Sequence, residues 1–388
     1  MNNFSSKSYD VIIIGAGSIG TPLALSLSAA GVKTLVLDQL SSVGQGSNKK
    51  AIGGVRATHS DKAKIRICLR SLKIMRTWQD IYGDDIEWQQ GGYCFVAYQP
   101  EDEQTLKTLL SRQKQLGLNI DWLDHHSLLQ AVPDLNPRHL LGGTFSPEDG
   151  SCSPLLFLHA CYQHACRLGA CFQFNEQVTS IDVHHGQITG LHTTRGAYQT
   201  KIVINAAGAW AAGLSNQAGI SIQVRPDSHE AGITEPVAKF LGPMIVDIRP
   251  VAASSNFYFY QHSTGQIIFC LTPSPNIWGF DQRETSEFLP LAAQRLINLI
   301  PRLTNIRVRR TWRGLYPMTP DGFPIVGWSN EVPGFFLAVG MCGQGLMLGP
   351  GLAELITRSI IASPAPEDDD TLSYLSPYRK FETEEKLK

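Results

Sequence analysis

The segment from Asp10 to Asp38 constrains the fold of this chain more than any other. Val11 to Ile14 form a continuous apolar run, as a strand buried on both faces requires. A glycine-rich turn, Gly15 to Gly20, follows directly, and the apolar spacing of Thr21 to Ala30 predicts a helix. Thr34 to Leu37 then predicts a second buried strand. The order of strand, glycine turn, helix and strand predicts a βαβ unit.

The glycines of the turn and the acid at Asp38 have roles in dinucleotide binding. Gly15 permits a tight turn, Gly17 lets the backbone approach a pyrophosphate, and Gly20 lets helix and strand pack closely. The N-terminus of the helix offers free N–H groups and partial positive charge to phosphates. Asp38 can accept hydrogen bonds from a ribose and disfavours a 2′-phosphate, so NADP is not expected. The unit alone does not separate FAD from NAD.

The remainder of the chain predicts a second domain inserted into the first. Helices are expected over residues 62–81, 101–116, 153–168, 287–300 and 345–361, and strands over 91–97, 177–184, 187–193, 202–205, 257–260 and 335–339. Residues 222–269 are rich in strand patterns, which indicates an antiparallel sheet. A last strand leads into a second glycine-rich helix start near Gly345, so the chain is expected to leave the dinucleotide-binding fold and return to it. The polar segment 367–388 is expected to wrap the surface.

Composition excludes several classes of function. The chain has 388 residues, which suggests two domains, with 33 Lys and Arg against 34 Asp and Glu. This balance gives no sign of a nucleic-acid partner or an anionic membrane surface. The first ten residues lack the regions of a signal peptide, and no apolar run near them could span a bilayer. Eight scattered cysteines do not form a disulfide scaffold, so a cytoplasmic protein with reduced thiols is expected.

Several separated motifs resemble one family. They are Gly15 to Gly20, Gly53 to Arg56, Pro147 to Gly150, Asn205 to Trp210, Thr234 to Pro236, Thr311 to Gly314, Thr319 to Gly327 and Gly343 to Pro350. With these motifs the chain resembles the D-amino-acid oxidase superfamily of FAD-dependent oxidoreductases. Within it, the likeness is greatest to the β subunits of sarcosine oxidase and of dye-linked L-proline dehydrogenase.

The resemblance implies the fold, the cofactor and its contacts. The fold class is α/β, with a Rossmann-like FAD-binding domain over residues 1–88, 145–220 and 315–388, and an inserted α+β substrate domain with an antiparallel sheet over residues 89–144 and 221–314. The cofactor is FAD rather than NAD. Its expected contacts are Gly15, Gly17, Ser18, Ile19, Gly20, Asp38, Gln39, Gly46, Ser47, Asn48, Val178, Ala207, Gly208, Trp210, Gly314, Gly343, Gln344, Gly345, Leu346 and Met347.

Departures from the family pattern are equally informative. Gly314 occupies the place of the flavin-linking cysteine of monomeric sarcosine oxidase, so the FAD is expected to be non-covalent. Met347 replaces the lysine that pairs with the substrate carboxylate in that enzyme, and Tyr316 stands where glycine oxidase has an arginine. No lysine occurs from Phe240 to Arg379, the region from which monomeric sarcosine oxidase supplies its oxygen-activating lysine. Slow reoxidation by oxygen is therefore expected.

The implied reaction is oxidation of a C–H next to an amine, by hydride transfer to flavin N5. Arg56 is the first candidate to bind a substrate carboxylate, and His59 is the second, although such an arginine can equally be a surface or phosphate-adjacent one. Tyr258 and Tyr260 share one strand face and could hydrogen-bond a substrate or be core residues. The cluster Arg309, Arg310 and Arg313 is more typical of a solvated face.

No metal site is expected. His159, Cys161, His164, Cys166 and Cys171 fall in one stretch, but it has no CxxC pair, and Cys161 and Cys166 point about 140° apart on a helix. Buried apolar cysteines are the simpler expectation. Two other functions stay open: oxidation of a 2-hydroxy acid by the same flavin, and a flavin-bearing subunit that passes electrons to a partner. A homo-oligomer is also possible.

Overall fold

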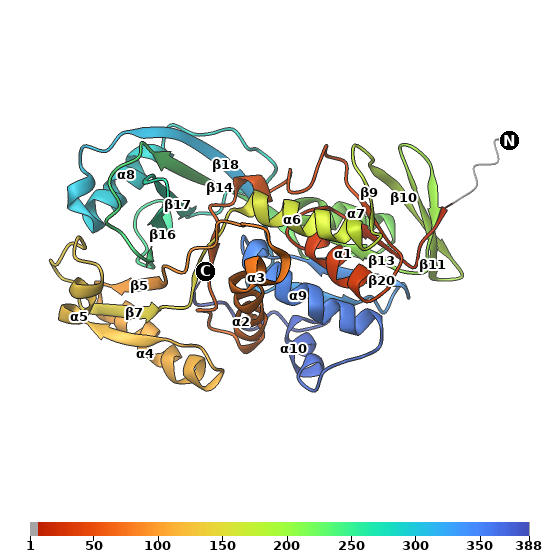
Figure 1. Cartoon of the computed structure of the whole chain (residues 1–388), viewed down its shortest axis with the longest axis horizontal. Coiled ribbons are helices and arrows are strands. Elements are labelled where there is room, and N and C mark those ends of the chain that lie inside the picture. The colour runs from red at the N-terminus through yellow and green to blue at the C-terminus, as the bar shows by residue number, and fades with distance from the viewer. Residues whose placement is uncertain (1–6, 388) are drawn as a thin grey trace.

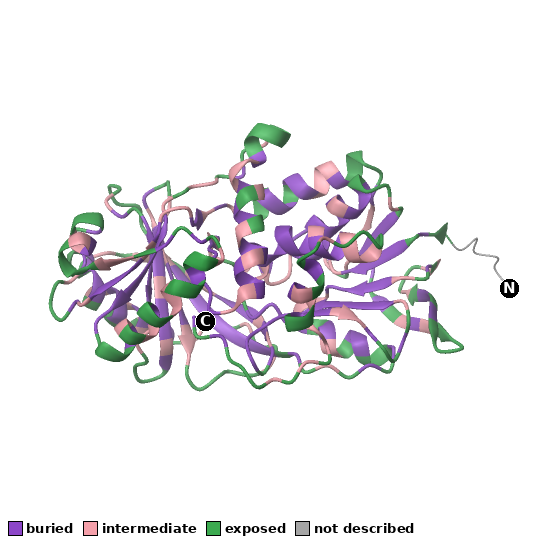
Figure 2. Ribbon diagram, turned by 90° about the horizontal axis from the view of Figure 1, so that it is seen from below, coloured by how far each residue is buried: buried purple, intermediate pink, exposed green. Residues whose placement is uncertain are grey.

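The computed structural model describes residues 7–387, which form two halves lying side by side (Figure 1). One half, on the right in that view, contains a six-stranded and a four-stranded sheet. The other half contains an eight-stranded sheet. The interiors of all these layers are buried, as Figure 2 shows for the sheets of both halves. The α/β class and the two-part organisation follow the expectation from the sequence.

The six-stranded sheet carries the N-terminal unit at its centre. Its strands, in spatial order, are β19 (Ile325–Trp328), β20 (Phe335–Val339), β13 (Val203–Asn205), β2 (Val11–Ile14), β3 (Thr34–Leu37) and β9 (Cys171–Gln173). Only β19 pairs antiparallel; the other neighbours are parallel. The chain therefore leaves this sheet after its first strands and returns to it near residue 325, as the glycine-rich helix starts predict.

Helices and a small sheet cover the two faces of this sheet. On one face, α1 (Gly20–Ala29) packs against α6 (Pro154–Arg167) and α9 (Gly345–Ile360). On the other face lie α7 (Ala211–Gln217) and the four-stranded sheet, formed by β1 (Lys7–Ser8), β12 (Ala197–Gln199), β11 (Gln187–Thr193) and β10 (Val178–His184). A sheet covered on both faces explains the continuous apolar runs of its strands.

The helix expected over residues 62–81 is divided in two. Helix α2 (Lys62–Arg76) is capped by the Asp61 carboxylate, and α3 (Trp78–Tyr82) follows it. Thr77 separates them, and its hydroxyl donates to the Lys73 carbonyl at 2.9 Å. A threonine that bonds its own helix in this way competes with the backbone ladder and favours a bend. Apolar periodicity continues across Thr77, so it does not reveal the break.

The eight-stranded sheet is assembled from two distant parts of the chain. Its order is β18 (Val308–Met318), β14 (Arg225–Thr234), β17 (Ile267–Pro273), β16 (Ser254–Gln261), β15 (Met244–Asp247), β5 (Tyr93–Ala97), β7 (Gly142–Ser146) and β6 (Asp121–Asp124). All pairs are antiparallel except β15 with β5, which joins the two parts. Strands β7 and β18 each run across one of the domain boundaries expected from the sequence.

Helices pack on both faces of this second sheet. Helices α5 (His125–Ala131) and α8 (Phe288–Leu299) cover one face, and α4 (Pro100–Gln115) lies on the other. A short pair, β4 (Gly54–Val55) with β8 (Gly150–Ser151), lies where the two halves meet, because β4 contacts α9 of one half and Tyr93 and Met244 of the other. Three 3₁₀ turns are η1 (Asn48–Lys50), η2 (Gly208–Trp210) and η3 (Pro301–Leu303).

The C-terminal segment departs from the sequence expectation. After α10 (Asp368–Leu375) it does not stay on the surface but turns inward, and its last described residues lie between the two halves (Figure 1). Glu385 and Leu387 are buried. The expectation of a wholly surface-wrapping tail is therefore wrong for its last residues. The alternation of single apolar and charged residues there is too short to predict burial.

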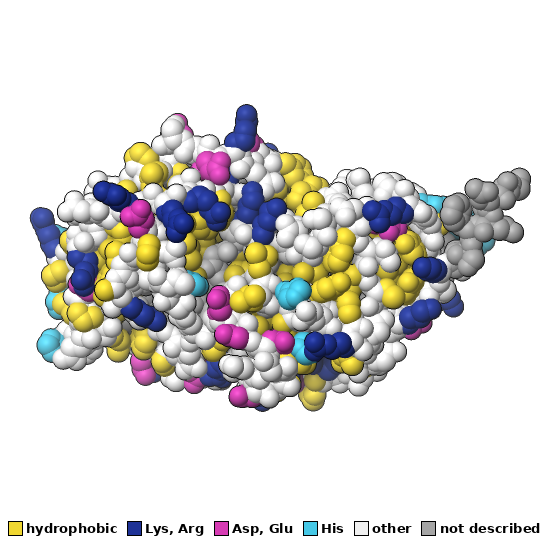
Figure 3. Space-filling model, turned by 45° about the horizontal axis from the view of Figure 1, so that its top comes forward, with side chains coloured by type: hydrophobic (Ala, Val, Ile, Leu, Met, Phe, Trp, Pro, Cys, Tyr) yellow, Lys and Arg dark blue, Asp and Glu magenta, His cyan; other side chains and the backbone are white. Residues whose placement is uncertain are grey.

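The surface mixes charges of both signs. On the face seen in Figure 3, Lys and Arg side chains gather over the half with the eight-stranded sheet, with Asp and Glu among them. None of the helices in the described part of the chain is long and apolar enough to cross a membrane.

Candidate functional site

A cavity of about 480 Å³ lies at the carboxyl ends of β2, β3 and β13, where the two halves meet. Of the residues expected to contact the cofactor, all line this cavity except Gly20. They come from seven separated segments of the sequence, and the fold brings them together around one cavity. Their contacts with a bound cofactor stay a prediction, but their common location is a property of the structure.

The three glycines of the first turn differ in what surrounds them. Gly15 has a φ of +111°, and a Cβ there would lie 2.4 Å from the Ala206 carbonyl oxygen. A Cβ on Gly20 would lie 1.9 Å from the Gly15 carbonyl oxygen. A Cβ on Gly17 would meet no protein atom within 4 Å. Gly15 and Gly20 are thus required by backbone packing, whereas Gly17 borders open space that a ligand can enter.

Two acids mark one end of the cavity. Asp38 accepts hydrogen bonds from the Ala16 N–H at 2.7 Å and the Leu40 N–H at 2.8 Å, and burial raises the pKa of its carboxyl. Glu176 is buried beside it and accepts from Tyr198 at 2.9 Å. Sequence analysis missed Glu176, because no motif surrounds it. Two carboxyl groups at this end disfavour an additional phosphate, in agreement with the expectation from Asp38.

The start of α9 is pressed against the first glycine turn. A Cβ on Gly349 would lie 2.0 Å from the Ser18 carbonyl oxygen, and a Cβ on Gly343, with φ +80°, would lie 2.1 Å from the Tyr316 ring. The Oε1 atom of Gln344 is buried with no hydrogen-bond partner among the described residues. The N-termini of α1 and α9 therefore both face one cavity, which concentrates N–H donors and partial positive charge there.

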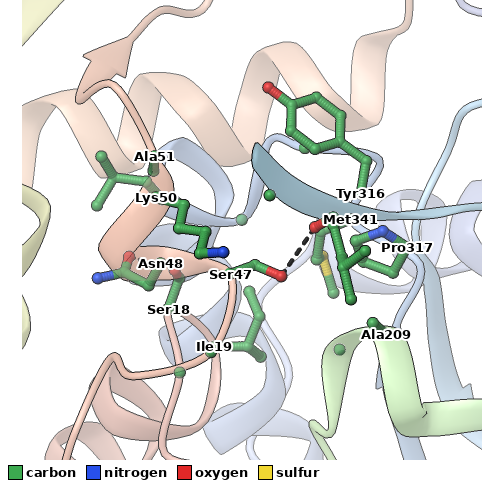
Figure 4. A pocket seen from close by; sticks show the side chains of 18 of the residues that line it. Ser18, Ile19, Ser47, Asn48, Lys50, Ala51, Ala209, Tyr316, Pro317 and Met341 are labelled. Atoms are coloured by element: carbon green, nitrogen blue, oxygen red, sulfur yellow. Dashed lines mark hydrogen bonds between the residues drawn. The ribbon is translucent and has the colours of Figure 1, made fainter. Parts of the chain in front are cut away.

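Figure 4 shows how the central part of the cavity is walled. Ser18 and Ile19 come from the first glycine turn, and Ser47, Asn48 and Lys50 come from η1 and the residue before it. The Ser47 hydroxyl donates to the Leu315 carbonyl at 2.8 Å, and the Ser18 hydroxyl donates to Asn48 at 2.7 Å. These bonds connect η1 and the residue before it to the first glycine turn and to strand β18.

His229 on β14 lines the other end of the cavity. Its Nε2 lies 3.0 Å from an Asp227 carboxylate oxygen, and its ring stacks on Tyr316 at 3.8 Å between centroids. Burial acts to raise the pKa of Asp227, but the bonds from His229, Asn276 and the Ile277 N–H outweigh it and hold the pKa below its usual value. The Nδ1 atom of His229 has no partner among the described residues.

Sequence analysis missed His229 as well. Strand β14 pairs with β18 so that His229 lies opposite Gly314 and Asp227 lies opposite Tyr316. Gly314 and Tyr316 were both singled out from the sequence. Only the pairing register, which no local pattern reveals, brings the histidine beside them.

The structure separates the two tyrosines expected to face substrate. Tyr258 lines the cavity, and its hydroxyl lies 2.8 Å from that of Tyr316. Tyr260 is not part of the cavity wall; its hydroxyl donates to the Ile52 carbonyl at 2.6 Å. Tyr260 thus supports the turn before β4, and of the two only Tyr258 can contact a ligand in this cavity.

Arg56 and His59 are both buried, but only Arg56 lines the cavity. The Arg56 guanidinium bonds the Thr58 carbonyl, His59 Nδ1 at 3.3 Å and the Leu387 carbonyl at 2.6 Å. Burial, with the charges of Arg56 and Lys64, holds the pKa of His59 well below its ordinary value, so its ring is neutral and can accept from Arg56. His59 therefore holds Arg56 in place and lies behind it.

Lys50 is a cation of the cavity wall that the sequence did not suggest. Its ammonium donates to the Arg313 carbonyl at 2.6 Å and to Gln282 at 2.7 Å. Burial and the charge of Lys49 lower its pKa. A Cβ on Gly314 would lie 3.2 Å from the Lys50 Cβ, so the two residues are in direct apposition.

The other basic and metal-binding candidates lie outside the cavity. Arg309 and Arg310 are exposed, and Arg313 is buried with its guanidinium on the Arg283 carbonyl at 3.0 Å. Among the residues that the structure describes, no cluster of three or more His, Cys, Asp or Glu could hold a metal ion. The expectation of buried cysteines fails for Cys166, which is exposed.

The geometry fits a flavin dinucleotide. The open space beside Gly17, the unpaired Gln344 oxygen and the two helix N-termini form a cradle for a large ligand with anionic groups. The model of the family described as FAD dependent oxidoreductase (DAO) matches residues 10–359. The chain belongs to this family. It is an FAD-dependent oxidoreductase.

Curated relatives and solved structures agree over nearly the whole chain. Hydrogen cyanide synthase subunit HcnC of Pseudomonas protegens is 26% identical, with 93% of this chain and 94% of the relative covered. Glycine oxidase of Geobacillus kaustophilus is also 26% identical, with 90% and 93% covered. The crystal structure of L-proline dehydrogenase from P. horikoshii superposes with a TM-score of 0.90 and 27% identity, covering 96% of this chain and 98% of that one.

Proposed function

We propose that this chain oxidises the C–N bond of an amino acid or secondary amine of the glycine, sarcosine or proline type. The observation that carries the proposal is the wall at the His229 end of the cavity. It combines a guanidinium, Arg56, with the hydrogen-bonded pair of His229 and Asp227 and the paired phenols of Tyr258 and Tyr316. A cation and a basic nitrogen in one wall suit a ligand with both a carboxylate and an amine.

The wall offers no activated nucleophile. Burial raises the pKa of Cys270 to about 11 and also raises that of Cys342, so both thiols that line the cavity are protonated. Bound FAD would supply the redox chemistry by accepting a hydride from the carbon next to the amine. The protein then needs only to bind, orient and deprotonate the substrate.

Each residue of the wall has a role in that scheme. Arg56 binds the carboxylate, because the three contacts described above leave N–H donors of its guanidinium free. Asp227, kept ionised by its depressed pKa, orients the Nε2–H of His229. With Nε2 engaged by Asp227, the ring nitrogen left to accept a proton from a substrate ammonium is Nδ1, which is unpaired among the described residues and buried in the ligand-free wall. Tyr316 stacks under this ring and fixes its plane.

The names of the relatives support an amine substrate, and two alternatives stay open. Their names specify glycine and L-proline for two of them, whereas HcnC is named as a subunit. Oxidation of a 2-hydroxy acid would use the same carboxylate anchor but would not need to deprotonate an amine. A flavin subunit that passes electrons to a partner protein, or assembles with copies of itself, remains the third candidate.

An anaerobic substrate panel tests the proposal. Holoenzyme is mixed with glycine, sarcosine, L-proline, D-amino acids and 2-hydroxyglutarate, and bleaching of the flavin absorbance is followed. We expect rapid bleaching by at least one amine and none by the hydroxy acid. Bleaching by the hydroxy acid alone would assign the second function. Bleaching by no compound, with dithionite still effective, would leave only the electron-transfer role.

A further inference from the structure

The last described residues of the chain form part of the wall behind the cavity. After α10, the Arg379 guanidinium pairs with the Asp321 carboxylate at 2.8 Å, and the Glu385 N–H donates to the Asp321 carbonyl at 3.0 Å. These bonds attach the tail to the motif from Thr319 to Gly327. From there the tail enters the space between the two halves (Figure 1).

Glu385 is anchored by a dense set of partners. One carboxylate oxygen accepts from the Ser60 N–H at 2.9 Å, the Ser60 hydroxyl at 2.6 Å and the Leu387 N–H at 3.0 Å. The other lies 3.2 Å from the ammonium of Lys64, and both charged side chains are fully buried. Burial acts to raise the pKa of Glu385, but Lys64 and these bonds lower it, so the anchor is ionised. Removing one partner of such a pair leaves the other buried and uncompensated.

Leu387 connects this anchor to the cavity wall. Its carbonyl accepts the 2.6 Å bond from Arg56, and its side chain, 0% exposed, packs in the apolar cluster that includes Tyr93, Phe95 and Tyr260. The Arg56 guanidinium lies over the Phe95 ring at 5.2 Å. The tail thus touches both the candidate carboxylate anchor and the side chains that surround it.

We propose that Glu385 and Leu387 are positioning residues for substrate binding, which act by holding the Arg56 guanidinium in place. This inference rests on the proposed function, in which Arg56 binds the substrate carboxylate. Arginine has a long side chain with many rotamers, so an unrestrained Arg56 must be ordered each time a ligand binds. Because the tail fixes Arg56 when the protein folds, the conformational entropy of this side chain is not lost again when a ligand binds.

The test compares tail variants of the holoenzyme. In one variant the chain stops after Glu384; in a second, full-length variant, Glu385→Ala removes only the anchor, and Glu385→Gln keeps an acceptor for Ser60. Glu382→Ala is the matched control, because this residue lies in the same tail with its side chain 74% exposed. The dissociation constants of acetate and benzoate are measured from the change in flavin absorbance, and KM and kcat are measured with the best substrate.

We expect both tail-disrupting variants to raise the dissociation constant and KM by about 3- to 10-fold, the effect of losing one pre-ordered side chain. Flavin content and kcat should stay near those of the wild type, as should every value for Glu382→Ala, and Glu385→Gln should recover part of the affinity. In an Arg56→Ala background the same tail variants should have no further effect on carboxylate affinity, because the tail acts through Arg56.

Other outcomes separate this inference from the proposed function. Carboxylate affinity that does not depend on the tail, or that changes equally with and without Arg56, would overturn the positioning role alone. Tail-dependent carboxylate binding without flavin reduction by any amine would overturn only the proposed function. A wild-type holoenzyme that binds no carboxylate and is reduced by no amine would overturn both.

Discussion

The two ends of the cavity are built in different ways. The end with Gly15 and Asp38 is organised by one continuous segment, in which local turns, a helix start and a strand end place several wall residues, and residues such as Glu176 and Gly345 complete it. The opposite end combines Lys50, Arg56, His229 and Tyr316 from distant strands and turns, and the tail supports it from behind. The part of the wall expected to hold the cofactor therefore depends largely on local sequence, and the part proposed to bind substrate depends on long-range pairing.

The largest expected effect concerns the end of the cavity formed by the first glycine turn and Asp38. Gly17→Val should abolish FAD binding without unfolding the protein, because a Cβ at Gly17 meets no protein atom but projects into the cavity. Gly20→Val is the contrasting variant, since its Cβ would collide with the Gly15 carbonyl and should prevent folding. The flavin absorbance per protein and the circular dichroism of both variants check this. Full flavin content in Gly17→Val would contradict the assignment of this turn.

A second all-or-none outcome concerns the attachment of the flavin. We expect acid precipitation to leave all of the yellow colour in the supernatant, because Gly314 offers no side chain for a covalent bond and Lys50 occupies the adjacent space. Colour retained in the pellet would show a covalent link from another residue. A heat-denatured sample is the control: flavin that is only trapped in the acid pellet should be released into its supernatant.

Arg56→Ala tests the opposite end of the cavity, where Arg56 and His229 lie. Loss of a charged hydrogen bond in a partly dry site costs about 2 to 4 kcal/mol, so kcat/KM should fall by about 30- to 1000-fold, mainly through KM. Flavin content should be unchanged, because Arg56 lies away from the glycine turns. Arg310→Ala, at an exposed position, is the matched control. An unchanged KM would move the anchoring role to Lys50.

A smaller effect is expected from a buried acid beside Arg56. Burial raises the pKa of Asp149 from 3.8 to about 7, although the Ala57 N–H and the Thr58 hydroxyl both donate to it. The folded state therefore holds a proton that the unfolded state loses between these two values. The free energy of unfolding should thus fall as pH rises from about 4 to about 7.

Asp149→Asn removes this proton but keeps the shape of the side chain. Its melting temperature should depend less on pH over the same range than that of the wild type. Glu148→Gln, at the neighbouring and more exposed carboxyl, serves as the control. Parallel pH profiles for the wild type and Asp149→Asn would show that Asp149 stays ionised in the fold.

The smallest expected effect concerns oxygen. A fixed cation beside the reduced flavin speeds its reaction with oxygen by stabilising the negative charge that forms. Sequence analysis found no lysine from Phe240 to Arg379, but Lys50 reaches the cavity from another segment. Its ammonium is engaged by two acceptors and its pKa is lowered, so we still expect slow reoxidation.

Stopped-flow mixing of reduced enzyme with oxygenated buffer measures this rate, and Lys50→Met should change it no more than a few-fold. Substrate should bleach the flavin quickly, and turnover should be faster with an artificial dye than in air. A rate typical of oxidases that collapses in Lys50→Met would instead make Lys50 the oxygen-activating residue.

Sequence patterns predict the local features of this molecule well. Strands β2, β3 and β20 have the expected bounds, and the residues expected to contact the cofactor gather in one cavity apart from Gly20. These successes share one cause: each rests on apolar periodicity or on a glycine turn within a short segment. The break at Thr77 was missed because side-chain bonding, and not periodicity, ends α2.

The residues missed by sequence reasoning all depend on distant partners. Glu176 lies in the loop between β9 and β10, where its N–H donates to the Asp38 carbonyl, and His229 is brought to the cavity by the register of β14 with β18. Lys50 lies outside the segment in which the family pattern places a lysine, so that pattern does not point to it. Leu387 is one apolar residue in a polar tail, and its burial depends on partners far away in the sequence, such as Arg56, which lies 331 positions before it.

The single parallel pair in the eight-stranded sheet, β5 with β15, has a consequence for engineering. It joins two distant stretches of chain, and exchanging a contiguous block that contains only one of them would pair a strand of this chain with a strand of a relative. A chimaera with a transplanted substrate half would need matched crossovers on both stretches, and both would have to preserve the same register. New specificity in this scaffold is therefore more accessible through side chains of the cavity wall than through recombination of whole segments.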